Sequence, residues 1–164
     1  MGVHYPLDIM GGRMMGQKIV QLRWADEEYR QLMVEAAAEL RAVLAHDCGK
    51  PLHACIASDT PYLSTREART VYRDRMSYDF EPVHATGLPM NVPPGAEMLL
   101  ATSHPHLTAA QRRQVLELTA LTSGYPLDDQ SERGSWQRLD LAAAMSATVR
   151  VDRDGNVHLI GRSR

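Results

Sequence analysis

The fold of this chain is decided first by the stretch Gly2-Val3-His4-Tyr5-Pro6-Leu7-Asp8-Ile9-Met10-Gly11-Gly12-Arg13. Proline is tolerated at the first position of a helix, so Pro6 is well placed to begin one. Apolar residues then recur at helical spacing to about Ala25, and they are Leu7, Met10, Met14, Met15, Ile19 and Leu22. The stretch therefore predicts a first helix with an apolar stripe.

Two polar residues at the start of this helix could carry chemistry. His4 and Asp8 are four positions apart, so a helix brings them close on one face. An aspartate that accepts from one imidazole nitrogen fixes the tautomer and leaves the other nitrogen as a nucleophile or base. The positive end of the helix also favours a nearby phosphate. Such a spacing is more often part of a solvated helix face, so the pair alone leaves both interpretations open.

Further helices follow along the chain. Asp26 can cap a second helix that ends at Gly49. Ser64 and Glu67 form the capping-box pattern of a third helix over about 65–76. Both helices are therefore bounded by local signals.

The second half of the chain is less regular. Five prolines and glycines predict a long ordered loop over 81–94, and a short helix fits 96–101. Thr108 caps another helix, whose predicted buried face consists of Val115, Leu118 and Leu121. A last helix is predicted from about 135 to Met145, with Trp136 and Leu139 as core anchors. Asp140 is expected to pair with Arg138 or with a neighbouring helix.

The C-terminal residues show the alternation of strands. Val149 and Val151 alternate, Asp154-Gly155 supplies a turn, and Val157 and Leu159 alternate again. We expect an all-α fold with a short β-hairpin at its C-terminus. The predicted division is a helical region over 1–147 and a hairpin or tail over 148–164.

Composition excludes several classes of protein. The net charge is -2, from 18 basic and 20 acidic residues, which favours neither nucleic acid nor an anionic membrane. No apolar run reaches the roughly 18 residues that cross a bilayer, and the first residues lack a signal-peptide pattern. His104 and His106 have no further metal ligands at suitable spacing, so we expect a loop and no metal site.

The segment around His4 and Asp8 closely resembles the last signature block of the PAP2 family, the class A acid phosphatases related to vanadium haloperoxidases. That block reads Ser-Arg, five residues, His, three residues, Asp. The resemblance extends over most of the chain, with Cys48-Gly49 to Cys55, Gly124-Tyr125-Pro126-Leu127-Asp128 and Trp136-Gln137-Arg138-Leu139-Asp140 among the similar segments. It implies the C-terminal part of the family's helical fold.

The resemblance also implies a reaction. A phosphomonoester would be hydrolysed through a phosphohistidine, with His4 as the nucleophile and Asp8 as its orienting partner. Phosphate or a phosphomonoester would be the ligand, and neither a cofactor nor a metal would be needed. Periplasmic or secreted relatives imply the same location here. They also imply a disulfide between Cys48 and Cys55, the alternative being two small buried thiols.

Several parts of the family pattern are not found in this sequence. They are the Lys and Arg of a first block, a Pro-Ser-Gly-His block, and the Ser-Arg that would precede His4. Phosphoryl transfer depends on charges that hold the phosphate oxygens, so we expect the chain alone to be inactive. Two alternatives stay open: an inactive fragment with a structural or interaction role, and completion of the site by another chain.

The resemblance finally bears on association. In the family fold, the first helix would lie against helices that come from the missing part. Large apolar side chains left in water are costly, at about 1.5–3 kcal/mol each. We therefore predict a symmetric homodimer through the apolar face of the first helix, formed by Leu7, Met10, Met14, Ile19 and Leu22.

Overall fold

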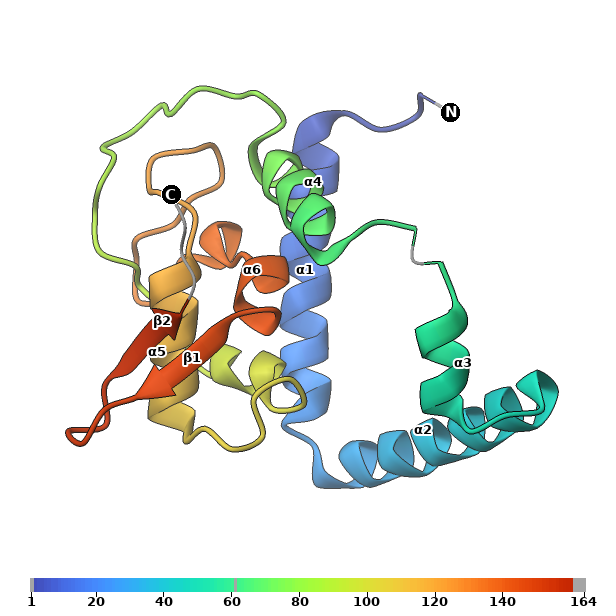
Figure 1. Cartoon of the computed structure of the whole chain (residues 1–164). Helices are drawn as coiled ribbons and strands as arrows, with labels where there is room; N and C mark the ends of the chain where they lie inside the picture. The colour runs from blue at the N-terminus through green and yellow to red at the C-terminus, as the bar shows by residue number, and fades with distance from the viewer. Residues whose placement is uncertain (1, 61, 161–164) are drawn as a thin grey trace.

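The computed structural model describes residues 2–60 and 62–160 of the 164-residue chain, which is mostly helical (Figure 1). The α-helices are α1 (Pro6–Trp24), α2 (Glu27–Cys48), α3 (Leu52–Ser58), α4 (Thr65–Ser77), α5 (Ala109–Thr119) and α6 (Leu141–Met145). Two short 3₁₀ helices are η1 (Ala96–Leu100) and η2 (Trp136–Arg138), and the strands are β1 (Thr148–Val151) and β2 (Val157–Ile160). The predicted helical class with a C-terminal hairpin is confirmed.

The predicted caps are present at three helices. The Asp26 carboxylate accepts from the Tyr29 amide at the start of α2, and Gly49 ends that helix in the left-handed conformation. Ser64 and Glu67 form the capping box of α4, and Thr108 and Gln111 form that of α5. These helix starts follow from local sequence because a cap satisfies amides that have no partner within the helix.

The hydrophobic core lies among η1, α5, η2, α6 and the hairpin. Its buried members are Val92, Ala96, Leu99, Leu100, Leu107, Val115, Leu116, Leu139, Ala144 and Val157. Leu139 and the half-buried Trp136 are core residues, as predicted. α1 packs its Met10 side against this body, next to η1 and η2.

Two arginines, the buried Arg138 and the half-buried Arg113, hold the long loop over residues 81–94 to the core. Arg138 donates to the carbonyl oxygens of Leu121, Pro89 and Leu88, at 2.8, 3.0 and 3.0 Å. Burial lowers the pKa of this guanidinium from its ordinary value. Arg113 donates in the same way to Val92 at 3.0 Å. Charged donors therefore satisfy carbonyls that no regular helix or sheet would pair.

The hairpin is part of this body rather than a free tail. β1 and β2 are antiparallel, with Thr148 opposite Ile160 and Val151 opposite Val157. Val157 is buried in the core cluster, and its amide donates to the Gln114 side chain of α5 at 2.7 Å. An isolated hairpin is marginal in water, so these contacts with α5 stabilise it.

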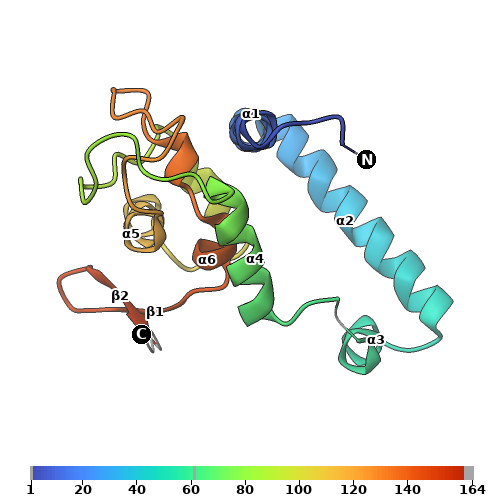
Figure 2. The same ribbon diagram turned by 90° about the horizontal axis from the view of Figure 1, so that it is seen from above.

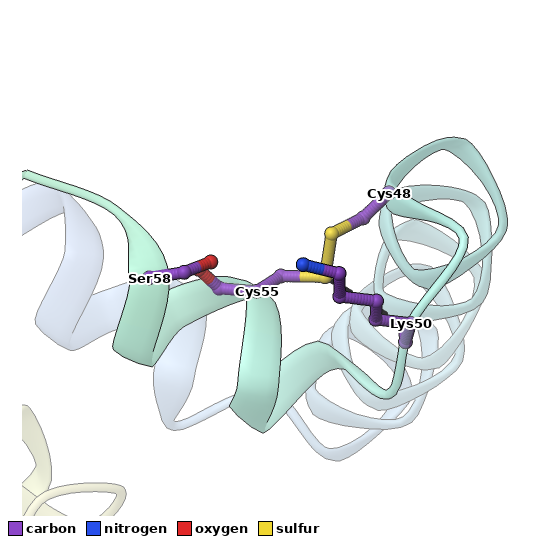
Figure 3. The surroundings of a disulfide bond; sticks show 4 residues. All are labelled: Cys48, Lys50, Cys55 and Ser58. Atoms are coloured by element: carbon purple, nitrogen blue, oxygen red, sulfur yellow. Dashed lines mark hydrogen bonds between the residues drawn. A yellow bond between two sulfur atoms is a disulfide. The ribbon is translucent and has the colours of Figure 1, made fainter.

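Helices α2 and α3 form an arm that leaves the core (Figures 1 and 2). No residue of α2 is buried, and several of its large apolar side chains are exposed: Leu32, Val34, Leu40, Val43 and Leu44. A disulfide between Cys48 and Cys55 joins the end of α2 to α3 (Figure 3). The structure thus favours the disulfide over two free thiols.

Two sequence predictions are wrong in detail, and one helix was missed. Leu118 is exposed, and Leu116 takes the buried place on α5. The last helix is split into η2 and α6, because the backbone leaves the helical conformation at Leu139 and Asp140 between them. Helix α3 was not predicted, since its seven residues are too few to show a helical period.

Candidate functional site

The predicted pair lies at the start of α1. Pro6 is the first residue of the helix and Tyr5 is its N-cap, so His4 lies just before the helix and Asp8 in its first turn. His4 Nδ1 is 3.8 Å from Asp8 Oδ2. The Asp8 carboxylate also accepts from the Tyr5 amide at 3.2 Å, which fixes the carboxylate at the helix start. The structure therefore brings the two predicted residues together.

The pair is open to solvent. The side chains of His4 and Asp8 are 64% and 58% exposed. A separation of 3.8 Å is longer than a hydrogen bond, so the imidazole lies near the Asp8 carboxylate without being hydrogen-bonded to it. Catalytic hydrogen bonds are often long before a substrate closes the site. The arrangement can present one imidazole nitrogen to an incoming phosphorus atom.

The basic residue of α1 nearest to the pair in sequence, Arg13, is bonded to the backbone of another part of the chain. Arg13 is on α1, but it donates to the carbonyl oxygens of Gln137 and Leu139, at 2.9 and 3.4 Å. Burial lowers the pKa of its guanidinium, and the charge of Asp140 partly offsets this shift. Within residues 2–60 and 62–160, no side chain other than these two partners contacts His4 or Asp8 through a hydrogen bond or ion pair. In the described part of the chain, the His4–Asp8 pair therefore has no cationic side chain bonded to it.

The sequence predicted a single apolar stripe on α1, but the structure divides these apolar residues between a buried face and an exposed face. Met10 is fully buried and Met14 is half-buried against the core, so neither is free to face a partner. Leu7, Ile19 and Leu22 are exposed, as the homodimer prediction needs. A Cβ added at Gly11, Gly12 or Gly16 would meet nothing within 4 Å. The glycines of α1 therefore mark an open face, not a close contact inside this chain.

Other polar residues from the sequence have structural surroundings. Asp140 pairs with Arg73 of the neighbouring helix α4 at 2.8 Å, and it caps α6 through the Ala143 amide. His104 is buried, with Nε2 2.8 Å from the Ala144 carbonyl oxygen. Asp128 accepts from the Gly124 amide at 3.1 Å, as a turn residue would. Each of these side chains therefore has a partner within the fold that gives it a structural role.

Comparison with protein-family models, curated proteins and solved structures found no match for this chain. In the part of the chain that the structure describes, no helix has both the length and the apolar character needed to cross a membrane. The described residues also contain no group of three or more His, Cys, Asp or Glu side chains placed to hold a metal ion. What the site can do therefore follows from the positions of its own residues.

Proposed function

We propose that this chain supplies the nucleophilic half of a phosphomonoesterase site of the PAP2 type. His4 is the nucleophile and Asp8 is its orienting partner. The groups that clamp the phosphate come from outside the described residues. The observation that carries the proposal is the His4–Asp8 pair itself, with 3.8 Å between Nδ1 and Oδ2 at the positive end of a 19-residue helix.

The geometry supports a two-step reaction. His4 Nε2 attacks phosphorus, an N–P bond forms, and the ester P–O bond breaks. The leaving alkoxide takes a proton from an acid on the completed site. Water then attacks the phosphohistidine, which breaks the N–P bond and releases inorganic phosphate. Asp8 stabilises the imidazolium character that develops at Nδ1 in the first step.

The direct test uses phosphoramidate, which phosphorylates accessible histidines without a protein clamp. We expect His4 to be labelled faster than the exposed His53 of α3, because His4 has a carboxylate beside its ring and His53 has none among the described residues. The variant Asp8→Asn should lower the labelling rate of His4 to that of His53. Labelling is followed by mass spectrometry of peptides at alkaline pH. Equal rates for the two histidines in the unmodified protein would refute the proposed role of Asp8.

A second readout is turnover of p-nitrophenyl phosphate. We expect negligible turnover by the chain alone, because Arg13 is occupied by backbone carbonyls and no other cationic side chain of the described residues is bonded to the pair. Turnover at ordinary enzyme rates that persists in His4→Ala would place the reaction elsewhere. Turnover that disappears in His4→Ala would show that other residues replace the clamp.

The alternative function is an interaction domain without catalysis. The observation that favours it is the exposed arm, where α2 has no buried residue. Equal labelling of His4 and His53 would favour this alternative. The Cys48–Cys55 disulfide is compatible with either function, and it supports a proposed periplasmic or secreted location, where disulfides persist.

We also propose that the open face of α1 forms a symmetric homodimer. Ile19 and Leu22 are each 56% exposed there, and the glycines leave room for a second helix. An apolar groove at Gly16, Val20 and Trp24 extends this face. Ile19→Asp should convert the dimer to a monomer, whereas Val34→Asp on the arm should not. Light scattering over a concentration series measures this, and a monomeric unmodified protein would refute the dimer.

A further inference from the structure

A second candidate site lies between α4 and the C-terminal hairpin. It is a cleft of about 670 Å³ between α4, the end of α5, α6 and the hairpin. Helix α4, which forms one side of this cleft, lies beside α6 (Figure 2). Among the described residues, none from α1 lines the cleft, so it is separate from the His4–Asp8 pair.

One wall of the cleft is basic. Arg66, Arg69 and Arg73 are spaced by three and four residues on α4, which places them on one face of the helix. Among the described lining residues, Asp140 is the only carboxylate. Three guanidinium groups against one carboxylate leave a formal charge of +2 on the described lining. That excess matches the charge of a phosphomonoester dianion.

Arg73 is held by other residues of the chain, whereas the described residues give the Arg66 and Arg69 side chains no partner. Arg73 pairs with the buried Asp140 at 2.8 Å and reaches the Thr119 carbonyl oxygen at 3.4 Å. Within the described part of the chain, no side-chain hydrogen bond or ion pair occupies the exposed Arg66 and Arg69. Arg73 therefore braces the wall, and the other two guanidinium groups remain available to an anion.

The opposite wall is apolar. Ala143, Ala147, Leu159 and Ile160 line it, and Thr65, Thr70 and Thr148 are also among the residues that line the cleft. Guanidinium groups bind phosphate oxygens through paired, charge-assisted hydrogen bonds. An apolar wall facing them would contact the organic part of the same molecule.

We propose that this cleft binds a small phosphomonoester, with its phosphate on Arg66 and Arg69 and its apolar group against Ala147 and Leu159. The proposal does not depend on the reaction proposed for His4, because the two sites share no residue. Binding here would be recognition without chemistry, since the described lining has no group placed as a nucleophile. The Arg73–Asp140 pair would hold α4 in position against α6.

The test uses phenylphosphonate, whose C–P bond resists hydrolysis, and isothermal titration calorimetry at low salt and mildly alkaline pH. We expect saturable one-to-one binding. The double variant Arg66→Gln/Arg69→Gln should weaken it by about tenfold or more, because each lost charge-assisted bond is strong. Methylphosphonate should bind several times more weakly, because it lacks the ring that would contact the apolar wall.

Three controls separate this site from other causes. Arg75→Gln removes a charge from α4 outside the cleft, where Arg75 lies over the Tyr72 ring, and it should leave the affinity unchanged. His4→Ala should also leave it unchanged. Ala147→Phe fills the apolar side and should abolish binding, with circular dichroism confirming that each variant is folded. The proposal is overturned by absent binding, by equal weakening in Arg75→Gln, or by loss in His4→Ala.

Discussion

The core and the arm of this molecule contain similar apolar residues but hold their structure in different ways. In the core, side chains such as Leu100, Leu116 and Leu139 are almost fully buried and meet partners from distant parts of the chain. In α2, Leu32 and Leu40 remain 57% and 58% exposed. Apolar residues at helical spacing therefore show that a helix forms, but not that a neighbour covers it.

Polar groups show the same contrast. Arg138 donates to the Leu88 carbonyl of the loop, 50 positions away, and to the Leu121 carbonyl after α5, 17 positions away. The arm depends on local devices: the Asp26 cap, the left-handed Gly49, and a disulfide that spans seven positions. We therefore expect the arm to unfold locally while the core stays folded. A destabilising substitution in the core should instead unfold the whole chain.

Replacing Arg138 should have the largest effect. Arg138→Met leaves the carbonyls of Leu121, Pro89 and Leu88 without their charged donor. We expect a loss of about 3–5 kcal/mol, because each buried unpaired acceptor is costly. The matched change Arg41→Met lies on the exposed arm and should alter the free energy of unfolding by less than about 0.5 kcal/mol. Urea denaturation of both variants measures the difference, and similar midpoints would contradict it.

Two glycines give the next contrast. Gly134 and Gly49 both have positive φ, at 82° and 67°. A Cβ at Gly134 would lie 2.4 Å from the Pro93 Cα, whereas one at Gly49 would meet nothing within 4 Å. Gly134→Ala should cost about 3 kcal/mol, and Gly49→Ala only about 1 kcal/mol of left-handed strain. Thermal unfolding compares them, and equal shifts would mean that the backbone at Pro93 relaxes freely.

Local signals predicted much of the fold. Caps at Asp26, Ser64 and Thr108 act within a few residues, so the sequence shows them directly. The proximity of His4 and Asp8 was predictable for the same reason, since the two residues are four positions apart at the start of α1. The hairpin was indicated by alternation and by a turn dipeptide at 154–155.

Long-range partners could not be predicted from the sequence. The spacing of Arg66, Arg69 and Arg73 is visible along α4, but the cleft needs Asp140 and the hairpin, which are far away in sequence. Met10 and Ile19 looked equivalent in the first helix, yet one is buried and the other 56% exposed. The difference arises because η1 and η2 pack against only one side of α1.

Reduction of the disulfide should affect the arm alone. Closing the short loop between Cys48 and Cys55 stabilises it by roughly 2–3 kcal/mol in the chain-entropy model. We expect faster hydrogen exchange in α3 after reduction, and unchanged exchange for core amides such as Leu116. The variant Cys48→Ser/Cys55→Ser should reproduce the reduced state. Two titratable thiols in protein purified under oxidising conditions would contradict the bridge, and slower core exchange on oxidation would contradict the independence of the arm.

The smallest expected effect is a pH response at the hairpin turn. The His158 imidazole and the Asn156 and Asp154 amides surround the Asp152 carboxylate, and they lower its pKa to about 2. A lowered pKa in the folded state means that ionised Asp152 stabilises the turn above its ordinary pKa of 3.8, and that this contribution is lost as pH falls towards 2.

We therefore expect the Asn156 amide resonance to titrate with a midpoint of about 2, while core resonances such as that of Leu100 do not follow it. Asp152→Asn should remove this titration, because the amide cannot ionise. The matched Asp154→Asn should keep it, since no hydrogen bond to the Asp154 carboxylate is present in the described turn. A midpoint near 4 in the unmodified protein would show that these hydrogen bonds do not persist in solution. The turn would then depend on its backbone hydrogen bonds and on the packing of Val157.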